Sequence, residues 1–263
     1  MEMKSNLPQD RYFSDESNKG KYSDLKNRLI PRNVGHEKVR VGAQRDGGYV
    51  YLKDFFNEAD TVYSCGIGSD PEGISFDQHC AELGKKVYMY DGTISKVPAE
   101  NSNFFFEKTN IEGKVFAQLL ERNQHSNKKN MVLKLDIGGY EYDLINRSLD
   151  SFYQNFSLIS MEAHGLIEEI PQSWRIDEPI KSIKMDKKVK IDFFEKLNQY
   201  YYLYHIHPNV HAPFYGDFCD SLELSYIRKD LIENPGIEYN SYPVMGLDYC
   251  NFPPYEDPVI KWW

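Results

Sequence analysis

The sequence has 263 residues, of which 41% are hydrophobic, and a formal net charge of −9. This length and apolar content allow one α/β domain of ordinary size. The acidic balance argues against nucleic acid as the main partner, because phosphate binding draws on clustered Lys and Arg.

The location of the protein can be predicted from three absences in the sequence. The polar N-terminal segment lacks the apolar core of a signal peptide, and no stretch of about 18 apolar residues could span a membrane. The four cysteines show no paired spacing of the kind found in zinc sites or disulfide frameworks. We therefore expect a cytoplasmic protein that does not insert into membranes.

The chain divides into a polar extension, residues 1–39, and one main domain, residues 40–263. A short helix is expected in the extension, because Ser23 can cap it and Pro31 ends it. The main domain begins with a predicted hairpin over residues 40–52, where Asp46-Gly47-Gly48 supplies residues typical of a turn.

The central part of the chain alternates between predicted strands and helices. Strands are expected at 61–66, 87–90, 103–107, 131–137 and 156–162, with helices around 74–83, 112–122 and 141–152. This alternation predicts a mostly parallel sheet with helices on both faces. Ligands of such sheets bind outside the carboxyl ends of the strands.

The segment after the fifth strand is rich in lysine, from residue 171 to residue 190. It is either a lid over a substrate or a solvated connection. A helix follows, with apolar residues on one face, and two last strands are predicted at 201–207 and 221–228. A hairpin between them adds an antiparallel strand, which gives a sheet of seven strands.

Two strand ends carry features of an adenosine-binding site. Gly66 and Gly68 follow the first central strand, where glycine lets the backbone turn sharply and approach a ligand. Asp91 follows the second strand and can accept hydrogen bonds from both hydroxyls of a ribose. A dinucleotide site would have a third glycine where Pro71 stands, so S-adenosylmethionine is the better-fitting cofactor.

Candidate catalytic residues follow the later strands. If the ligand opposite such a cofactor reacts through a hydroxyl group, a nearby residue must take the hydroxyl proton. Asp136 ends the fourth strand, Glu162 and His164 end the fifth, and His207 lies on the sixth. We expect His164 to be the base with His207 as second choice, Asp136 to orient the cofactor or acceptor, and Glu162 to orient His164. The alternative for each residue is a structural role at the end of a buried strand.

A metal ion is the open alternative to a protein base. Two carboxylates and a histidine at one sheet edge could hold Mg²⁺ or Mn²⁺. The sequence contains no dense Asp-x-Asp or His-x-x-x-His element that would fix such a site. We therefore expect no metal site and an activity that survives chelation.

A succession of short pieces carries a resemblance to a known family. The pieces are Arg40-Val41-Gly42, Asp46-Gly47-Gly48-Tyr49, Tyr63-Ser64-Cys65-Gly66-Ile67-Gly68, Tyr90-Asp91, Leu133-Lys134-Leu135-Asp136-Ile137, Glu162-Ala163-His164, His205-Ile206-His207-Pro208-Asn209 and Leu222-Glu223-Leu224-Ser225-Tyr226-Ile227-Arg228. Their order and spacing resemble class I S-adenosylmethionine-dependent methyltransferases of the FkbM-like group. The resemblance implies a seven-stranded Rossmann-like fold and methylation of a hydroxyl, often on a sugar.

The resemblance also bears on individual residues. It implies that Asp46, Gly48 and Tyr49 form a wall of the cofactor pocket. Members usually carry a Lys-x-Asp-x-Glu-Gly-x-Glu pattern after the fourth strand, and Gly138 stands here in place of its first Glu. Lys134, Asp136, Gly139 and Glu141 match the rest of the pattern.

The sequence thus predicts an O-methyltransferase acting on a sugar or glycan. The expected partner is a saccharide acceptor, with no nucleic acid, and association with glycan-building enzymes is a further possibility. Two other interpretations stay open: a Rossmann-type NAD(P)-dependent oxidoreductase, and a non-catalytic glycan-binding domain that retains the fold.

Overall fold

The computed structural model describes residues 12–13, 20–111, 113–168, 170, 186–253 and 255–263. The central sheet has seven strands in the order β10-β13-β9-β8-β5-β6-β7. In chain order these strands are β5 (Thr61–Cys65), β6 (Lys86–Tyr90), β7 (Phe104–Glu107), β8 (Met131–Leu135), β9 (Phe156–Ala163), β10 (Tyr201–Pro208) and β13 (Leu222–Arg228).

The order of the strands creates a crevice at the centre of the sheet. The first strand of the central sheet is β5. The chain then moves outward through β6 and β7 and returns to add β8 and β9 on the other side of β5. These strands are parallel, whereas β13 runs antiparallel between β9 and β10. The predicted Rossmann-like class I methyltransferase fold is therefore confirmed. Ligands of such sheets bind where the strand order reverses, here between β5 and β8.

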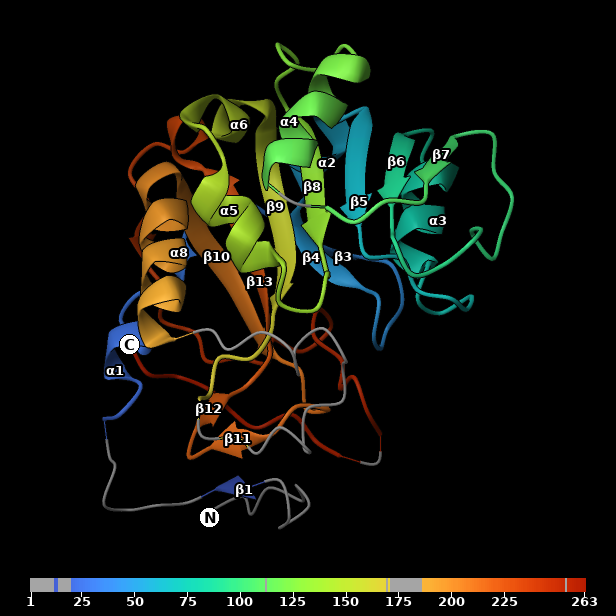
Figure 1. Ribbon diagram of the computed structural model, residues 1–263. Helices are drawn as coiled ribbons and strands as arrows, with labels where there is room; N and C mark the ends of the chain where they lie inside the picture. Colours follow the sequence, from blue (N-terminus) through green and yellow to red (C-terminus); the bar gives the residue numbers. More distant parts are fainter. Residues whose placement is uncertain (1–11, 14–19, 112, 169, 171–185, 254) are drawn as a thin grey trace.

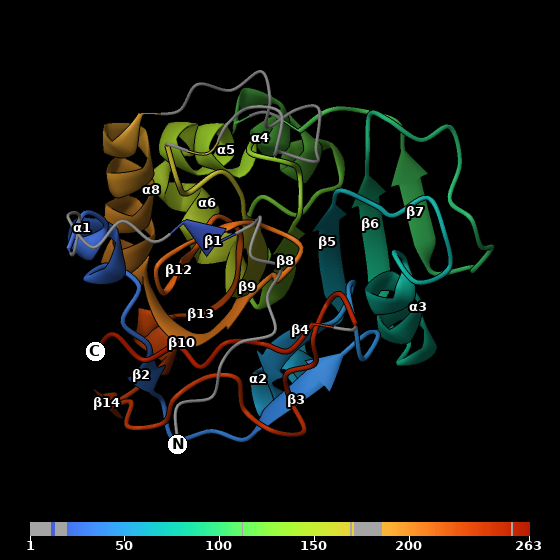
Figure 2. The ribbon, with the colours of Figure 1, turned by 90° about the horizontal axis from the view of Figure 1, so that it is seen from below.

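Helices and a hairpin cover the two faces of the sheet (Figures 1 and 2). One face carries α4 (Gly113–Arg122), α5 (Glu141–Arg147), α6 (Asp150–Asn155) and α8 (Lys187–Tyr200). The other carries α2 (Lys53–Glu58), α3 (Ser75–Glu82) and the predicted hairpin of β3 (Lys38–Val41) and β4 (Tyr49–Leu52). Successive residues of β8 enter opposite cores, Val132 on the hairpin side and Leu133 on the α5 side, as expected for a strand buried on both faces.

One predicted helix differs from the structure, and most of the lysine-rich segment lies outside the described residues. The single helix expected over 141–152 is two helices, because Ser148 and Leu149 adopt extended backbone between them. The Ser148 hydroxyl donates to the Leu144 carbonyl at 2.6 Å and so satisfies a group at the end of α5. Of the lysine-rich segment, residues 171–185 lie outside the described part of the chain. Lys190, which the solvated interpretation placed in water, is buried in α8.

Segments from the ends of the chain pack on this domain. In the N-terminal extension, α1 (Ser23–Lys26) follows β-strand β1 (Tyr12–Phe13), and Leu25 and Leu29 are buried in the same core as α5 and α8. Two small sheets complete the fold: β1 with β11 (Phe214–Tyr215) and β12 (Phe218–Cys219), and β2 (Arg32–Asn33) with β14 (Gly236–Ile237).

The carboxyl ends of the parallel strands point toward the lower end of the molecule in Figure 1. Figure 2, seen from below, shows β11, β12 and the red C-terminal segment around this end. Within the described residues, no helix combines the length and apolar character needed to cross a bilayer.

Candidate active site

Two cavities meet at the carboxyl end of the sheet. The first has a volume of about 430 Å³ and is bordered by the ends of β5, β6 and β8, including Gly66 and Asp91. The second, of about 580 Å³, lies on the β9 side. Asp136 and His164 line both cavities. The arrangement therefore gives two ligands separate places that touch the same two side chains.

The backbone at the end of β5 forms one wall of the first cavity. Gly66 has a φ of +81°, and a Cβ atom there would lie 1.7 Å from the carbonyl oxygen of Asp136. Any other residue would push the end of β5 away from that of β8. Gly68 does not line the cavity; its Cα packs on Gly73, and a Cβ on Gly68 would lie 2.3 Å from the Cα of Gly73. Gly66 is thus placed at the predicted cofactor site, while Gly68 shapes the loop.

Asp91 lines the first cavity and also holds its loops. Its Oδ2 accepts a hydrogen bond of 2.8 Å from the backbone amide of Ile67, and its Oδ1 accepts from the amide and hydroxyl of Thr93, both at 2.6 Å. The amide of Ile94 also donates to Oδ1, at 3.3 Å. A carboxylate oxygen can accept more than one hydrogen bond, so capacity remains at Oδ2 for a ligand hydroxyl. The residue predicted to bind a ribose is therefore also the residue that fixes the glycine loop.

The turn of the first hairpin lies at the second cavity and not at the first. Asp46 lines the second cavity, and neither Gly48 nor Tyr49 is among the residues that line the first. The Tyr49 hydroxyl donates to Oδ2 of Asp136 at 3.2 Å. A Cβ on Gly48 would lie 2.0 Å from the carbonyl oxygen of Ala43, so this glycine is needed for packing inside the turn.

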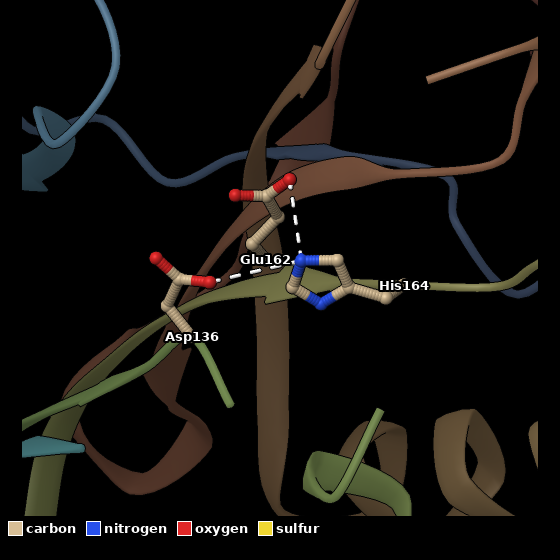
Figure 3. A group of neighbouring side chains, drawn as sticks. All are labelled: Asp136, Glu162 and His164. Atoms are coloured by element: carbon tan, nitrogen blue, oxygen red, sulfur yellow. Dashed lines mark ion pairs between the residues drawn. The ribbon is translucent and has the colours of Figure 1, made fainter. Parts of the chain in front are cut away.

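Asp136, Glu162 and His164 form a cluster between the two cavities (Figure 3). Nε2 of His164 lies 3.4 Å from Oε1 of Glu162 and 3.7 Å from Oδ1 of Asp136. One ligand atom from each of the three residues lies within 4.8 Å of the other two. The fold thus brings together three residues that the sequence placed only at the same sheet edge.

The charged groups of this cluster shift one another's pKa values. Burial alone would lower the pKa of His164, but the carboxylates of Glu162, Glu141 and Asp136 raise it well above its ordinary value. Burial raises the pKa of Glu162 to about 8, although His164 opposes the shift. Burial would also raise the pKa of Asp136, but the positive charges of Lys134 and His164 outweigh burial and lower it. Near neutral pH the cluster therefore carries an imidazolium, which is not yet a free base.

Three residues to which the sequence analysis gave no role hold the cluster in place. Oε1 of Glu141 accepts from the backbone amide of His164 at 2.9 Å and contacts its Nδ1 at 3.2 Å. Asn209 and Ser221 both donate to Oε1 of Glu162 at 2.7 Å. The family-like pattern around Glu141 and the His-Pro-Asn piece ending at Asn209 were the signals that could have identified two of them.

His207 and His205 belong to a separate buried network. Nδ1 of His207 lies 3.0 Å from Glu223, and its Nε2 lies 2.9 Å from Asp257. His205 contacts Asp248 at 2.6 Å. Neither histidine lines either of the two cavities. The structure therefore does not bring His207, the second-choice base, to the site. Its Nδ1 contacts the neighbouring strand β13 through Glu223, and its Nε2 contacts Asp257 of the C-terminal segment.

The remaining walls of the second cavity come from distant parts of the chain. They include residues 209, 211–213, 220–221 and 251–253. Phe252 is 39% exposed, and its ring meets that of His211 edge-on at a centroid distance of 4.3 Å. His211 appeared in sequence to be an ordinary loop residue. Carboxylates of Asp46 and Glu72 lie on the same walls, with Arg45 beside them.

Comparison with known proteins adds resemblances of overall arrangement. No family model matches the sequence, and no curated protein matches it. The fibrillarin pre-rRNA processing protein of Methanococcus jannaschii is 10% identical, with 66% of this chain and 68% of that chain covered and a TM-score of 0.38. The 16S rRNA (adenine(1408)-N(1))-methyltransferase of Catenulisporales acidiphilia is 9% identical, with 69% and 92% covered and a TM-score of 0.34.

A variant of the latter enzyme, solved with the cosubstrate SAM, is 10% identical, with 78% of this chain and 98% of that chain covered and a TM-score of 0.35. We transfer no activity at this level of similarity. One expectation is nevertheless corrected. These neighbours are named for RNA processing and rRNA methylation, so the acidic net charge does not exclude nucleic acid, and we withdraw that exclusion.

Proposed function

We propose that the protein is an S-adenosylmethionine-dependent O-methyltransferase that methylates a hydroxyl of a sugar or glycan. The cofactor occupies the first cavity, beside Gly66 and Asp91. The acceptor occupies the second. The observation that carries the proposal is that Asp136 and His164 line both cavities, because a group transfer needs its two reactants in contact at one place.

The residues of the first cavity suit an adenosine-containing ligand. Oδ2 of Asp91 has hydrogen-bonding capacity for a ribose hydroxyl. Ile111 and Ile137 offer apolar surface for a purine ring, and the Asn110 amide can bind its polar edge. A Cβ on Gly92 would lie 1.7 Å from Oδ1 of Asn110, so a side chain there would displace that amide. When bound, S-adenosylmethionine supplies an electrophilic methyl group on a sulfonium.

The second cavity suits a neutral, hydroxyl-rich acceptor. Carboxylates such as Asp46 and Glu72 accept hydrogen bonds from hydroxyl groups, and Asn209 and Ser221 hold Glu162 in the same wall. Phe252 offers a partly exposed aromatic face, which packs well against the apolar face of a sugar ring. This combination supports a saccharide over a purely apolar acceptor.

The cluster would act on the hydroxyl proton of the acceptor. Asp136 and His164 touch both cavities, so a hydroxyl that reaches the methyl group must pass beside them. Glu162 holds the imidazole from one side and Glu141 from the other. We assign removal of the proton to Asp136, Glu162 and His164 together, and we assign His207 no part in it.

Calorimetry and a transfer assay test the proposal. Wild-type protein should bind S-adenosylmethionine and not a nicotinamide cofactor, and it should transfer a labelled methyl group to members of a panel of neutral saccharides. An RNA substrate is included as a competing acceptor. Absence of S-adenosylmethionine binding would overturn the function, binding without transfer to any acceptor would support the non-catalytic alternative, and transfer to RNA alone would overturn the acceptor class.

A further inference from the structure

The cluster between the cavities has the composition of a cation site. Asp136 and Glu162 each offer a carboxylate oxygen and His164 offers Nε2, all within 4.8 Å of one another. Ligand atoms around one ion at 2.1–2.4 Å are separated by about 3.0–4.8 Å, depending on whether they are adjacent or opposite. We propose that Asp136, Glu162 and His164 bind one divalent cation of the Mg²⁺ or Mn²⁺ class.

A fourth residue, outside the three ligands, orients the histidine as a ligand. Glu141 is fully buried, and its Oε1 faces Nδ1 of His164 at 3.2 Å. Its other oxygen, Oε2, accepts from the amide of Gly139 at 2.8 Å, so the carboxylate is held from both ends. A carboxylate behind the distal nitrogen is the usual support of a metal-binding histidine, because it places the proton on that nitrogen and leaves the other nitrogen for the ion.

The nitrogen that faces the carboxylates has no hydrogen bond to any described residue. His164 is only 5% exposed, and its nearest polar neighbours at Nε2 are Glu162 and Asp136 at ion-pair distances of 3.4 and 3.7 Å. Figure 3 shows this nitrogen directed between the two carboxylates. A buried nitrogen lone pair that points at two carboxylates is favourable only when a cation or a proton lies among them.

The donor set and the location together suggest which cation binds. Carboxylate oxygens are preferred by Mg²⁺ and Mn²⁺, and a single imidazole is more readily accepted by Mn²⁺ than by Mg²⁺. Three protein ligands leave positions open, and His164 and Asp136 border both cavities. This role of the ion rests on the proposed function: the ion would lower the pKa of an acceptor hydroxyl bound to it.

The neighbouring histidine network provides an internal contrast. His207 also lies among carboxylates, but its two nitrogens already contact Glu223 and Asp257 at 3.0 and 2.9 Å, and it lines neither cavity. It has no free lone pair and no open side. The sequence analysis expected no metal site because the sequence lacks a dense ligand motif. The fold instead brings the proposed ligands together from two strand ends, so we now infer a metal site.

Mn²⁺ titration of the metal-free protein, followed by electron paramagnetic resonance, tests the site. We expect one saturable Mn²⁺ ion per chain. Asp136→Asn, Glu162→Gln and His164→Ala should each weaken its binding by about tenfold or more, and Glu141→Gln by about 10- to 100-fold as a residue behind a ligand. Glu72→Gln is the matched control: it removes one negative charge from the same cavity without removing a ligand, and its Mn²⁺ affinity should stay within about twofold of wild type.

The outcomes separate this inference from the proposed function. Circular dichroism first shows that each variant is folded; if His164→Ala or Glu141→Gln unfolds, the test rests on the isosteric variants Asp136→Asn and Glu162→Gln. No saturable Mn²⁺ binding to wild type, or equal weakening in Glu72→Gln and the ligand variants, would overturn the cation site. Methyl transfer that survives complete chelation would also overturn it and leave the function standing. Site-specific Mn²⁺ binding without any S-adenosylmethionine binding would leave the cation site standing and overturn the function.

Discussion

The two cavities are built in different ways. The first lies within one continuous stretch, residues 66–140 together with His164, where strand ends and the loops after them sit side by side. The second combines the first hairpin turn, the end of β9, the loop after β10 and the C-terminal residues 251–253. The comparison teaches that the sheet itself makes the first cavity, whereas separate segments laid over the sheet make the second.

Replacement of His164, which lines both cavities, should have the largest effect on activity. His164→Ala should reduce kcat by about 10²- to 10⁴-fold, because in the proposed function the cluster acts on the acceptor proton in the transition state. The Kd for S-adenosylmethionine, measured by calorimetry, should change by less than about threefold, since the cofactor contacts proposed for Asp91 would remain. A near-normal kcat in this variant would contradict the proposal that His164 acts where the two cavities meet.

The second effect concerns how the C-terminal segment is attached. His207→Ala leaves the carboxylates of Glu223 and Asp257 facing each other in a buried site, and the free energy of unfolding at pH 7 should fall by about 2–4 kcal/mol. Urea denaturation measures this, and kcat of the folded variant should stay within about tenfold of wild type. A loss of kcat as large as in His164→Ala, without destabilisation, would instead return His207 to the active site.

The same pair of proteins gives a pH test. Burial would lower the pKa of His207, but Glu223 and Asp257 raise it to about 10. A raised folded-state pKa means that the stabilisation is complete below the unfolded value near 6.5 and is lost as the pH rises toward 10. The stability difference between wild type and His207→Ala should therefore shrink from pH 7 to pH 9.5, and a constant difference would contradict this assignment.

The third effect tests the first cavity alone. Asp91→Ala removes the expected ribose contacts together with the anchor of the Ile67 amide, and S-adenosylmethionine binding should weaken by about 2–3 kcal/mol, or about 30- to 150-fold. Asp91→Asn should lose somewhat less. The acceptor KM at saturating cofactor should be unchanged. Calorimetry that shows normal cofactor affinity in both folded variants would remove Asp91 from the cofactor site.

The smallest effect tests the second cavity alone. Phe252→Ala should raise the KM for a saccharide acceptor by about 3- to 10-fold, because a partly exposed aromatic face is worth about 1 kcal/mol. Neither kcat at saturation nor cofactor affinity should change beyond about twofold. Phe252→Tyr, which keeps the aromatic face, is the control. If cofactor affinity falls with acceptor affinity, the two cavities are less separate than their construction suggests.

The difference in construction also explains how much could be predicted. The strands, their order of appearance and the placement of Gly66, Asp91 and Asp136 at strand ends follow from hydrophobic patterns of a few residues each. Their convergence follows from the rule that parallel strands present their carboxyl ends on one edge. The fold and the first cavity could therefore be predicted from local sequence.

The second cavity could not be predicted in this way. Nothing in the sequence near Phe252 indicates that it meets His211, since their contact depends on how the C-terminal segment crosses the sheet edge. The surroundings of His207 could not be predicted for the same reason, because its partner Asp257 is 50 residues away in the sequence. Sequence spacing likewise placed Asp136, Glu162 and His164 at one edge, but only their distances in the fold show that they can share an ion.

The two cavities adjoin at Asp136 and His164, because these two residues line both spaces. A single molecule that joins an adenosine fragment to a hydroxylated ring through a short linker would thus reach both. Linking two weak ligands makes the second binding event intramolecular and raises the overall affinity by about 10²- to 10⁴-fold when the linker matches the span. The loops of the second cavity would then decide which ring such a bisubstrate inhibitor should carry.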